Sequence, residues 1–129
     1  MLKGVVTLRD ELEGSDAEFR DILDYPDWLW FGIWDGIYLL DFLGCDSSRH
    51  YKEFGSITEQ EAQSFGLDKL FTWFVIFGNR ERIVDGLIGR GVENGTVYLI
   101  TRRLVELLES DRRKMELIED STWTAASQR

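Results

Sequence analysis

Cys45 and His50 are the two residues whose side chains could act as a nucleophile and its general base. A thiol attacks as its thiolate, and the base beside it needs a third group that holds it in place. Both residues lie in the polar stretch 45–55, which we expect to be a loop, and nothing in that stretch would lower the pKa of the thiol. The sequence therefore favours a surface histidine and a small buried thiol over a catalytic pair.

Metal and phosphate sites are not predicted either. His50 is the only histidine, and together with Cys45 it gives too few ligands for a closed zinc site. The stretch GLIGRG, residues 86–91, reverses the glycine order of the dinucleotide fingerprint, and no P-loop lysine motif occurs. We interpret these glycines as bends and a turn, and we expect no cofactor.

Carboxylates dominate residues 10–27, where Arg20 is the only base. Such a run is usually a solvated helix face. The alternative is a docking surface for a basic protein, such as a nuclease toxin or another nucleic-acid-binding protein, because carboxylates would steer its approach. The acids best placed to share one side of a helix are Asp10, Glu13, Asp21 and Asp24.

Three of the five tryptophans stand close together in WLWFGIWDGIYLLDFLG, residues 28–44. The pair Asp35-Gly36 is typical of a type I′ turn, so the stretch predicts a β-hairpin. Opposed residues of a hairpin share a face, and in this register one face is almost wholly apolar and forms core. The other face would carry Trp28, Trp30, Gly32, Trp34 and Asp41.

That second face allows three interpretations. Gly32 would leave a notch between the indoles of Trp30 and Trp34, with Asp41 opposite Trp30, and such a notch suits a flat or cationic small molecule. The same tryptophans would serve as a protein hot spot. The third interpretation is that a helix covers the face and Gly32 permits its close approach. Asp41 is also the one carboxylate we would name for acid–base catalysis.

Two further helices are predicted towards the termini. Residues 7–24 favour a helix whose main part starts at Ser15, since Ser15 and Glu18 have capping-box spacing and Pro26 would end it. Residues 102–119 form the clearest helix, with a potential Glu109–Arg113 pair. Its apolar stripe consists of Leu104, Val105, Leu108, Met115 and Ile118.

Strands and turns are predicted for most of the middle of the chain. A short helix over 56–66 would be capped by Thr58 with Glu61 or by Ser56 with Glu59. Residues 69–78 suggest a buried strand. For residues 79–91 we favour a bent strand over a helix capped by Asn79, because the pair Asn94-Gly95 predicts a hairpin turn.

The expected fold class is α+β, with a mainly antiparallel sheet of about five strands and helices packed on it from both ends of the chain. We expect residues 1–129 to form one domain, with residues 120–129 as a polar, disordered tail from which Trp123 could dock onto the domain. Residues 74–109 resemble the closing strands and helix of the SUKH superfamily of bacterial toxin-immunity proteins, in a glycine after a strand and a strand leading into a final helix. The other motifs of that superfamily are absent, so no residue role is carried over.

The formal net charge of −9 weighs against nucleic acid and anionic membranes as partners. No signal peptide or membrane span is expected, and the single Cys45 fits a reducing cytoplasm. Our first hypothesis is therefore a small, acidic, non-enzymatic binding protein of the inhibitor or immunity kind that masks a basic protein partner. The alternative is a small-molecule-binding domain that uses the aromatic notch, with a homodimer as its expected form. An enzyme is the third option.

Overall fold

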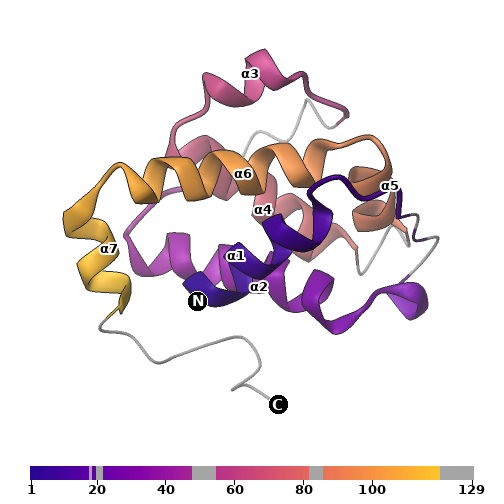
Figure 1. The fold of residues 1–129 in the computed structure, drawn as a ribbon, viewed down its shortest axis with the longest axis horizontal. Helices are drawn as coiled ribbons and strands as arrows, with labels where there is room; N and C mark the ends of the chain where they lie inside the picture. Colours follow the sequence, from indigo (N-terminus) through magenta and orange to yellow (C-terminus); the bar gives the residue numbers. More distant parts are fainter. Residues whose placement is uncertain (18, 20–21, 48–54, 82–85, 120–129) are drawn as a thin grey trace.

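Helices make up the whole framework of the protein. The computed structural model describes residues 1–17, 19, 22–47, 55–81 and 86–119, and all statements about the structure concern this part of the chain. Its elements are α1 (Leu2–Leu12), a short 3-10 turn η1 (Ile22–Asp24), α2 (Asp27–Phe42), α3 (Glu59–Gln63), α4 (Leu67–Arg80), α5 (Leu87–Glu93), α6 (Thr96–Glu109) and α7 (Arg112–Glu119). Figure 1 shows α1 in front of α2 and α6 in front of α4, with α5 and α7 at opposite ends.

The predicted antiparallel sheet is wrong, since no strand occurs among the described residues. The predicted hairpin over 28–44 is the single helix α2, and the predicted strand over 69–78 lies inside α4. Both stretches are apolar nearly throughout, so their overall hydrophobic pattern does not separate a buried strand from a buried helix, and only the aromatic spacing within 28–44 has a helical period. Tertiary packing decided the conformation here.

Helix α2 packs against α1 so closely that two glycines are required between them. A Cβ atom on Gly32 would stand 2.6 Å from Cβ of Leu8, and one on Gly4 would stand 1.8 Å from Oδ2 of Asp35. The pair Asp35-Gly36, predicted as a turn, lies buried in the middle of α2. Close contact with α1 therefore explains Gly32, which the predicted hairpin had placed between two tryptophans.

Helix α4 supplies the aromatic centre of the core. Phe74 and Phe77 are almost completely buried. A Cβ atom on Gly36 would come within 2.6 Å of the Phe74 ring, and one on Gly78 would come within 2.6 Å of Ile37, so α4 and α2 also meet at glycines. Since α2 has α1 and α4 on two sides, only part of its circumference is left towards solvent.

The turn between α5 and α6 replaces the predicted Asn94-Gly95 hairpin. Gly95 adopts the left-handed conformation, with φ 84°, that glycine accepts without strain, and Oδ1 of Asn94 accepts a hydrogen bond from the Thr96 N–H at 3.0 Å. The same turn chemistry joins two helices as readily as two strands. Of the interval 79–91, residues 82–85 lie outside the described part, and 87–91 are helical rather than a bent strand.

The predicted C-terminal helix is confirmed in type but divides into α6 and α7. The division falls at Ser110 and Asp111, and Asp111 caps α7 by accepting the backbone N–H of Lys114 at 3.2 Å. The predicted stripe is buried at four of its positions and half-buried at Met115. The pair Ser110-Asp111 ends α6 and starts α7, although the apolar stripe continues across it.

Two local predictions near other helix ends had different outcomes. The capping box of Thr58 and Glu61 is confirmed at the start of α3, with both reciprocal hydrogen bonds present. The N-terminal helix ends at Leu12 instead of starting at Ser15, and Pro26 precedes α2 as its N-cap residue instead of ending a helix. Glu18, the other half of that predicted capping box, lies outside the described residues, as does the predicted tail 120–129.

Helix α5 is capped at its N-terminus by Glu81, which lies shortly before it in the chain, and by Tyr25, which lies far from it in the sequence. The buried carboxylate of Glu81 accepts the backbone N–H groups of Leu87 and Ile88 at 3.0 and 3.3 Å, and it also accepts the Tyr25 hydroxyl. That hydroxyl in turn accepts the N–H of Gly89 at 2.8 Å. These bonds satisfy donors that would otherwise be orphaned at the start of a buried helix.

None of the helices in the described ranges has the length and apolar character needed to cross a membrane.

Candidate functional site

The most unusual surface of the protein is the partly exposed side of α2, which borders the contact with α4, since a Cβ atom on Gly78 would stand 3.4 Å from the Trp34 ring. Trp30, Trp34, Tyr38 and Phe42 follow one another at intervals of four residues, so they form a row along the helix. Ring centroids lie 6.0 Å apart for Trp30 and Trp34 and 5.8 Å apart for Trp34 and Tyr38. We call these four residues the aromatic row.

The aromatic row is partly open to solvent. Phe42 is 50% exposed, which is high for a large apolar side chain, and the three other rings are half-buried. Large aromatic side chains that line up on a surface typically mark an interaction site, since single exposed apolar residues are common but contiguous ones are rare. A helix that is apolar on nearly all sides is normally enclosed, so the outward side of α2 is the natural place for a partner.

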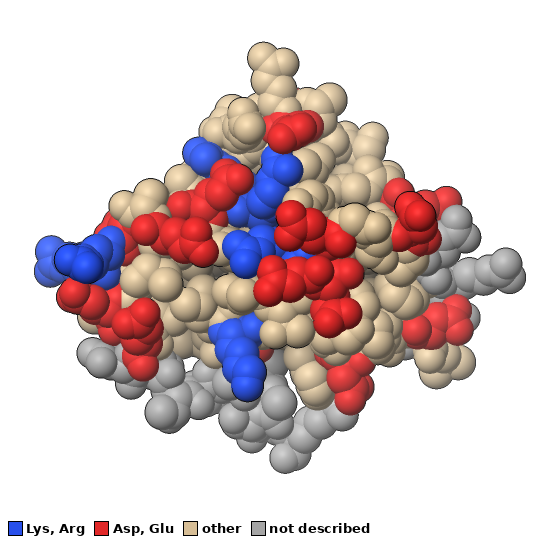
Figure 2. Space-filling view, in the orientation of Figure 1, with Lys and Arg blue, Asp and Glu red and all other residues tan. Residues whose placement is uncertain are grey.

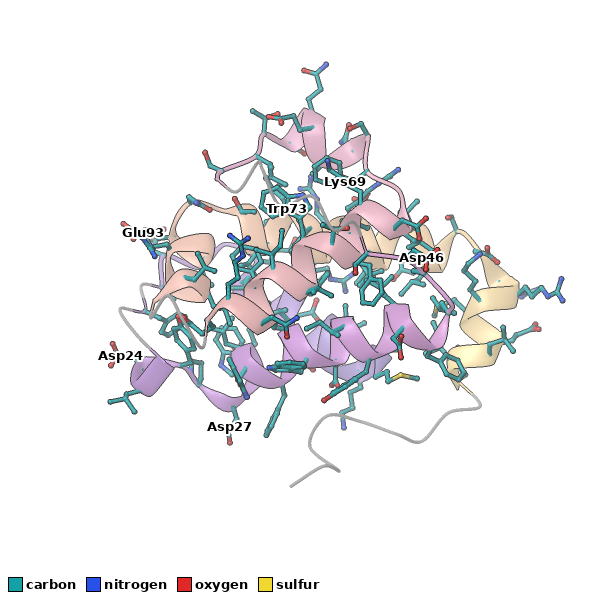
Figure 3. The ribbon with its side chains drawn as sticks, turned by 180° about the vertical axis from the view of Figure 1, so that it is seen from behind. Asp24, Asp27, Asp46, Lys69, Trp73 and Glu93 are labelled. Atoms are coloured by element: carbon teal, nitrogen blue, oxygen red, sulfur yellow. The ribbon has the colours of Figure 1, made fainter. Side chains whose placement is uncertain are left out.

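Carboxylates accompany the row at both ends. Asp27 and Asp41 are exposed on α2, and the helix sequence DWLWFGIWDGIYLLDF contains neither lysine nor arginine. Figure 3, which shows the molecule from behind, has Asp27 projecting away from the body at the start of α2. The surface thus offers π faces and negative charge together, which is a combination that attracts guanidinium and ammonium groups.

The predicted notch has a different geometry in the helix. Gly32 is buried against Leu8 of α1, on another side of α2 from the row. Trp30 and Trp34 are brought together, but they pack edge to face against each other and leave no glycine-sized gap between them. Trp28 leaves the group and contacts Phe19 at a centroid distance of 6.1 Å.

The physical reason is the change of period from 2 to 3.6. Residues 28, 30, 32 and 34 share a face in a strand, whereas a helix turns 28 and 32 away from 30 and 34. Asp41 stands three turns from Trp30 along α2 instead of opposite it. Binding through Trp30, Trp34 and Asp41 stays a prediction, and the hairpin that would have joined them to Trp28 and Gly32 is absent.

The predicted acidic face is only partly assembled. Asp10 and Glu13 lie at the end of α1, both exposed, whereas Asp24 is exposed on η1 and Asp21 lies outside the described residues. The sites on α1 are poor ones for helix stability, because carboxylates near a helix C-terminus oppose the dipole by about 0.3–1 kcal/mol each. Helix stability therefore does not explain why Asp10 and Glu13 occur at the end of α1.

Negative charge nevertheless covers the side of the molecule on which α1 and α6 lie, with basic side chains set among the carboxylates (Figure 2). Three arginines there have ion-pair partners. Arg9 pairs with Asp10 at 2.9 Å, Arg102 pairs with Glu59 at 2.6 Å, and Arg103 lies 3.7 Å from Glu106. Pairing neutralises these cations locally, so the surrounding carboxylates give the face its net sign.

Cys45 has the environment of a structural thiol. Burial raises the pKa of this half-buried thiol, and the nearby carboxylate of Asp68 raises the pKa further. A raised pKa reduces the thiolate fraction at neutral pH, which is the opposite of what a nucleophile needs. His50, its suggested partner, lies outside the described residues. Within the described ranges, no three His, Cys, Asp or Glu side chains converge as metal ligands would.

Sequence reasoning missed Tyr38 and Phe42, because the hairpin register had placed both residues on the apolar core face. The signal that could have found them is the spacing of aromatic residues at 30, 34, 38 and 42, which has the period of a helix.

Comparisons with protein-family models, with curated proteins and with solved structures gave no match for this chain. The argument for function therefore depends on the site alone.

Proposed function

We propose that this protein is a small, non-enzymatic binding protein whose aromatic row on α2 docks onto a basic protein partner and masks part of its surface. The observation that carries the proposal is the row Trp30, Trp34, Tyr38 and Phe42 with Asp27 and Asp41 at its ends, on a helix without a single basic residue. The action is that of an inhibitor or immunity protein, through steric and electrostatic masking with no covalent step. The single Cys45 supports a cytoplasmic setting.

The aromatic row supplies the anchor of this interface. Tryptophan and tyrosine are enriched among the residues that dominate binding energy, and they act best where neighbouring contacts exclude water. The rings of Trp30, Trp34 and Tyr38 already contact one another, so little side-chain entropy remains to be lost on binding. A row of this kind suits a partner with apolar side chains and arginine stems.

The carboxylates supply the selectivity for a basic partner. Asp27 and Asp41 are close enough to the row to pair with basic residues that stack on its rings. Asp10 and Glu13 lie on α1 and contribute at longer range to the field of a chain with net charge −9. Charges of this second kind change the rate of association more than the lifetime of the complex.

The proposal can be tested without knowledge of the natural partner. A library of displayed random peptides is selected on the intact wild-type protein alone, and the enriched peptides are then measured against Trp34→Ala. We expect the enriched peptides to combine lysine or arginine with apolar residues, and to lose binding to Trp34→Ala by at least ~30-fold, the effect of removing a hot-spot tryptophan. Leu117→Ala is the matched control, since Leu117 is a 51% exposed apolar residue on α7.

Circular dichroism establishes that both variants fold before binding is compared. Enriched peptides without basic residues would contradict the proposed partner class. Peptides that bind Trp34→Ala as tightly as wild type would contradict the proposed surface. Native mass spectrometry tests whether a second copy of the chain occupies the aromatic row instead of a basic protein. A dimer that Trp34→Ala converts to a monomer would show that it does.

Small-molecule binding remains a second candidate function, although not at the predicted notch. The observation that favours it is a separate cavity between α4 and α5, which contains no residue of α2.

A further inference from the structure

A cavity of about 350 Å³ opens beside the junction of α4 and α5. Its described lining residues are Gly55, Phe77, Arg80, Leu87, Arg90, Gly91 and Asn94. The volume lies at the lower end of the range in which small-molecule pockets fall, roughly 300–1,000 Å³. Figure 3 shows this region of α4 and α5 above α2, so the cavity and the aromatic row belong to different helices.

The apolar floor of the cavity results from tight packing of α5 on α4. A Cβ atom on Gly91 would stand 2.4 Å from the ring of Phe77, so only glycine lets α5 approach so closely. Phe77 and Leu87 are both buried. Their side chains form a surface on which a small ring or hydrocarbon group can rest.

The polar side chains of the lining are all hydrogen-bond donors. Arg90 contributes an exposed guanidinium group, which has no acceptor atoms, whereas Arg80 already has an interaction partner and is not counted as a ligand-binding group. Oδ1 of Asn94 already accepts the Thr96 N–H at 3.0 Å, so the group that Asn94 can offer a ligand is its NH₂ donor. No carboxylate belongs to the described lining, although the chain as a whole carries a net charge of −9.

From this arrangement we propose that the cavity between α4 and α5 binds a small anion that carries a carboxylate or phosphate group on an aromatic or compact apolar body. The guanidinium group of Arg90 matches both oxyanions because its N–H donors form paired, charge-assisted hydrogen bonds. The apolar body of the ligand rests against Phe77 and Leu87. This site is independent of the partner-binding surface on α2 and does not depend on the function proposed above.

The test uses benzoate and phenyl phosphate as probes of the intact, isotope-labelled protein. Chemical shifts of the Gly55, Gly91 and Asn94 amides are followed during titration, and the amides of α7, at the opposite end of the molecule in Figure 1, serve as an internal reference. We expect saturable shifts at the cavity with at least one of the two probes. Which probe binds more tightly distinguishes a carboxylate ligand from a phosphate ligand.

Variants separate a specific site from general attraction of anions. Arg90→Ala, at an exposed position, should weaken binding by at least about tenfold, as expected for a lost charge-assisted hydrogen bond. Arg113→Ala removes the same charge from α7 and should leave binding unchanged. Inorganic phosphate and phenol, each with half of the proposed chemistry, should both bind more weakly than phenyl phosphate.

Three results would overturn the proposal. The first is the absence of shifts at the cavity amides with both probes. The second is equal weakening by Arg90→Ala and Arg113→Ala, which would show that net charge alone matters. The third is binding of inorganic phosphate or phenol as tight as that of phenyl phosphate, since the cavity would then recognise only one half of the ligand.

Discussion

The two sides of α2 differ in the residues they carry and in what those residues contact. The inward side consists of glycines, aliphatic residues and the buried Asp35, and it meets α1 and α4 with almost no exposed surface. The outward side carries the aromatic row and two aspartates. One helix therefore combines close packing at its glycines with the most unusual open surface of the described structure.

The two sides of α2 also differ in the size of their side chains. Large aromatic side chains are usually the best material for a core, because each removes a large apolar area from water. In α2 the core positions have small or aliphatic residues instead, and the rings of the row are left partly in solvent. Substitutions on the two sides should therefore act on different quantities: stability on the inward side and binding on the outward side.

The largest effect on stability is expected from Leu40→Ala. Leu40 is fully buried, so its truncation removes apolar contacts and leaves a cavity, at a cost of about 2–5 kcal/mol in the free energy of unfolding. Urea denaturation followed by circular dichroism measures the change. Leu117→Ala, at an exposed leucine on α7, is the control and should change little. A loss below about 1 kcal/mol at Leu40 would mean that the inward side is loosely packed.

Gly32→Val should come next, with a loss of about 1–3 kcal/mol from overpacking. The new side chain would begin 2.6 Å from Cβ of Leu8, so α1 and α2 would have to separate. Gly55→Val is the matched control, since a Cβ atom at Gly55 meets nothing within 4 Å. Thermal unfolding of both variants compares them directly, and equal melting temperatures would argue against the close α1–α2 contact.

The two aspartates of the outward side should have small effects of opposite sign on stability. Asp27 lies in the first turn of α2 and Asp41 in the last, so the helix dipole favours the first carboxylate and opposes the second. Asp27→Asn should lower the free energy of unfolding by about 0.3–1 kcal/mol, and Asp41→Asn should raise it by a similar or smaller amount. Both substitutions should weaken the binding of basic peptides, most strongly at low salt.

The urea midpoints at low and high salt measure this pair of effects. A gain of stability with a loss of binding at Asp41 would be a direct sign that this carboxylate serves recognition. If Asp41→Asn lowered both quantities, the carboxylate would have a structural role on α2.

Phe42→Ala should have the smallest effect on folding, within about 0.5 kcal/mol, because half of this side chain is already in water. The same substitution should reduce binding of the selected peptides, since Phe42 is the most open ring of the row. Calorimetric titration with one such peptide measures the loss. Unchanged binding would shorten the proposed contact surface to Trp30, Trp34 and Tyr38.

Some local features could be predicted because neighbouring residues are enough to form them. The capping box of Thr58 and Glu61 needs only a hydroxyl and a carboxylate three residues apart. The apolar stripe around Leu104 and Leu108 has a clear helical period beside charged residues, so its type was recognised. The candidate site could be predicted only in part: Trp30, Trp34 and Asp41 were named, but with the wrong neighbours.

The sequence by itself determined the charge of the protein, the helical character of its best amphipathic segment and the local cap of α3. Tertiary structure decided the conformation of the stretch around Phe74, which is apolar on nearly every side, and of the stretch around Trp34, where only the aromatic spacing has a helical period. It also decided the start of α5, where the Tyr25 hydroxyl, from a distant position in the chain, accepts the Gly89 N–H and donates to Glu81. The physical reason is that burial and hydrogen-bond satisfaction depend on which segments meet, and that is a property of the whole chain.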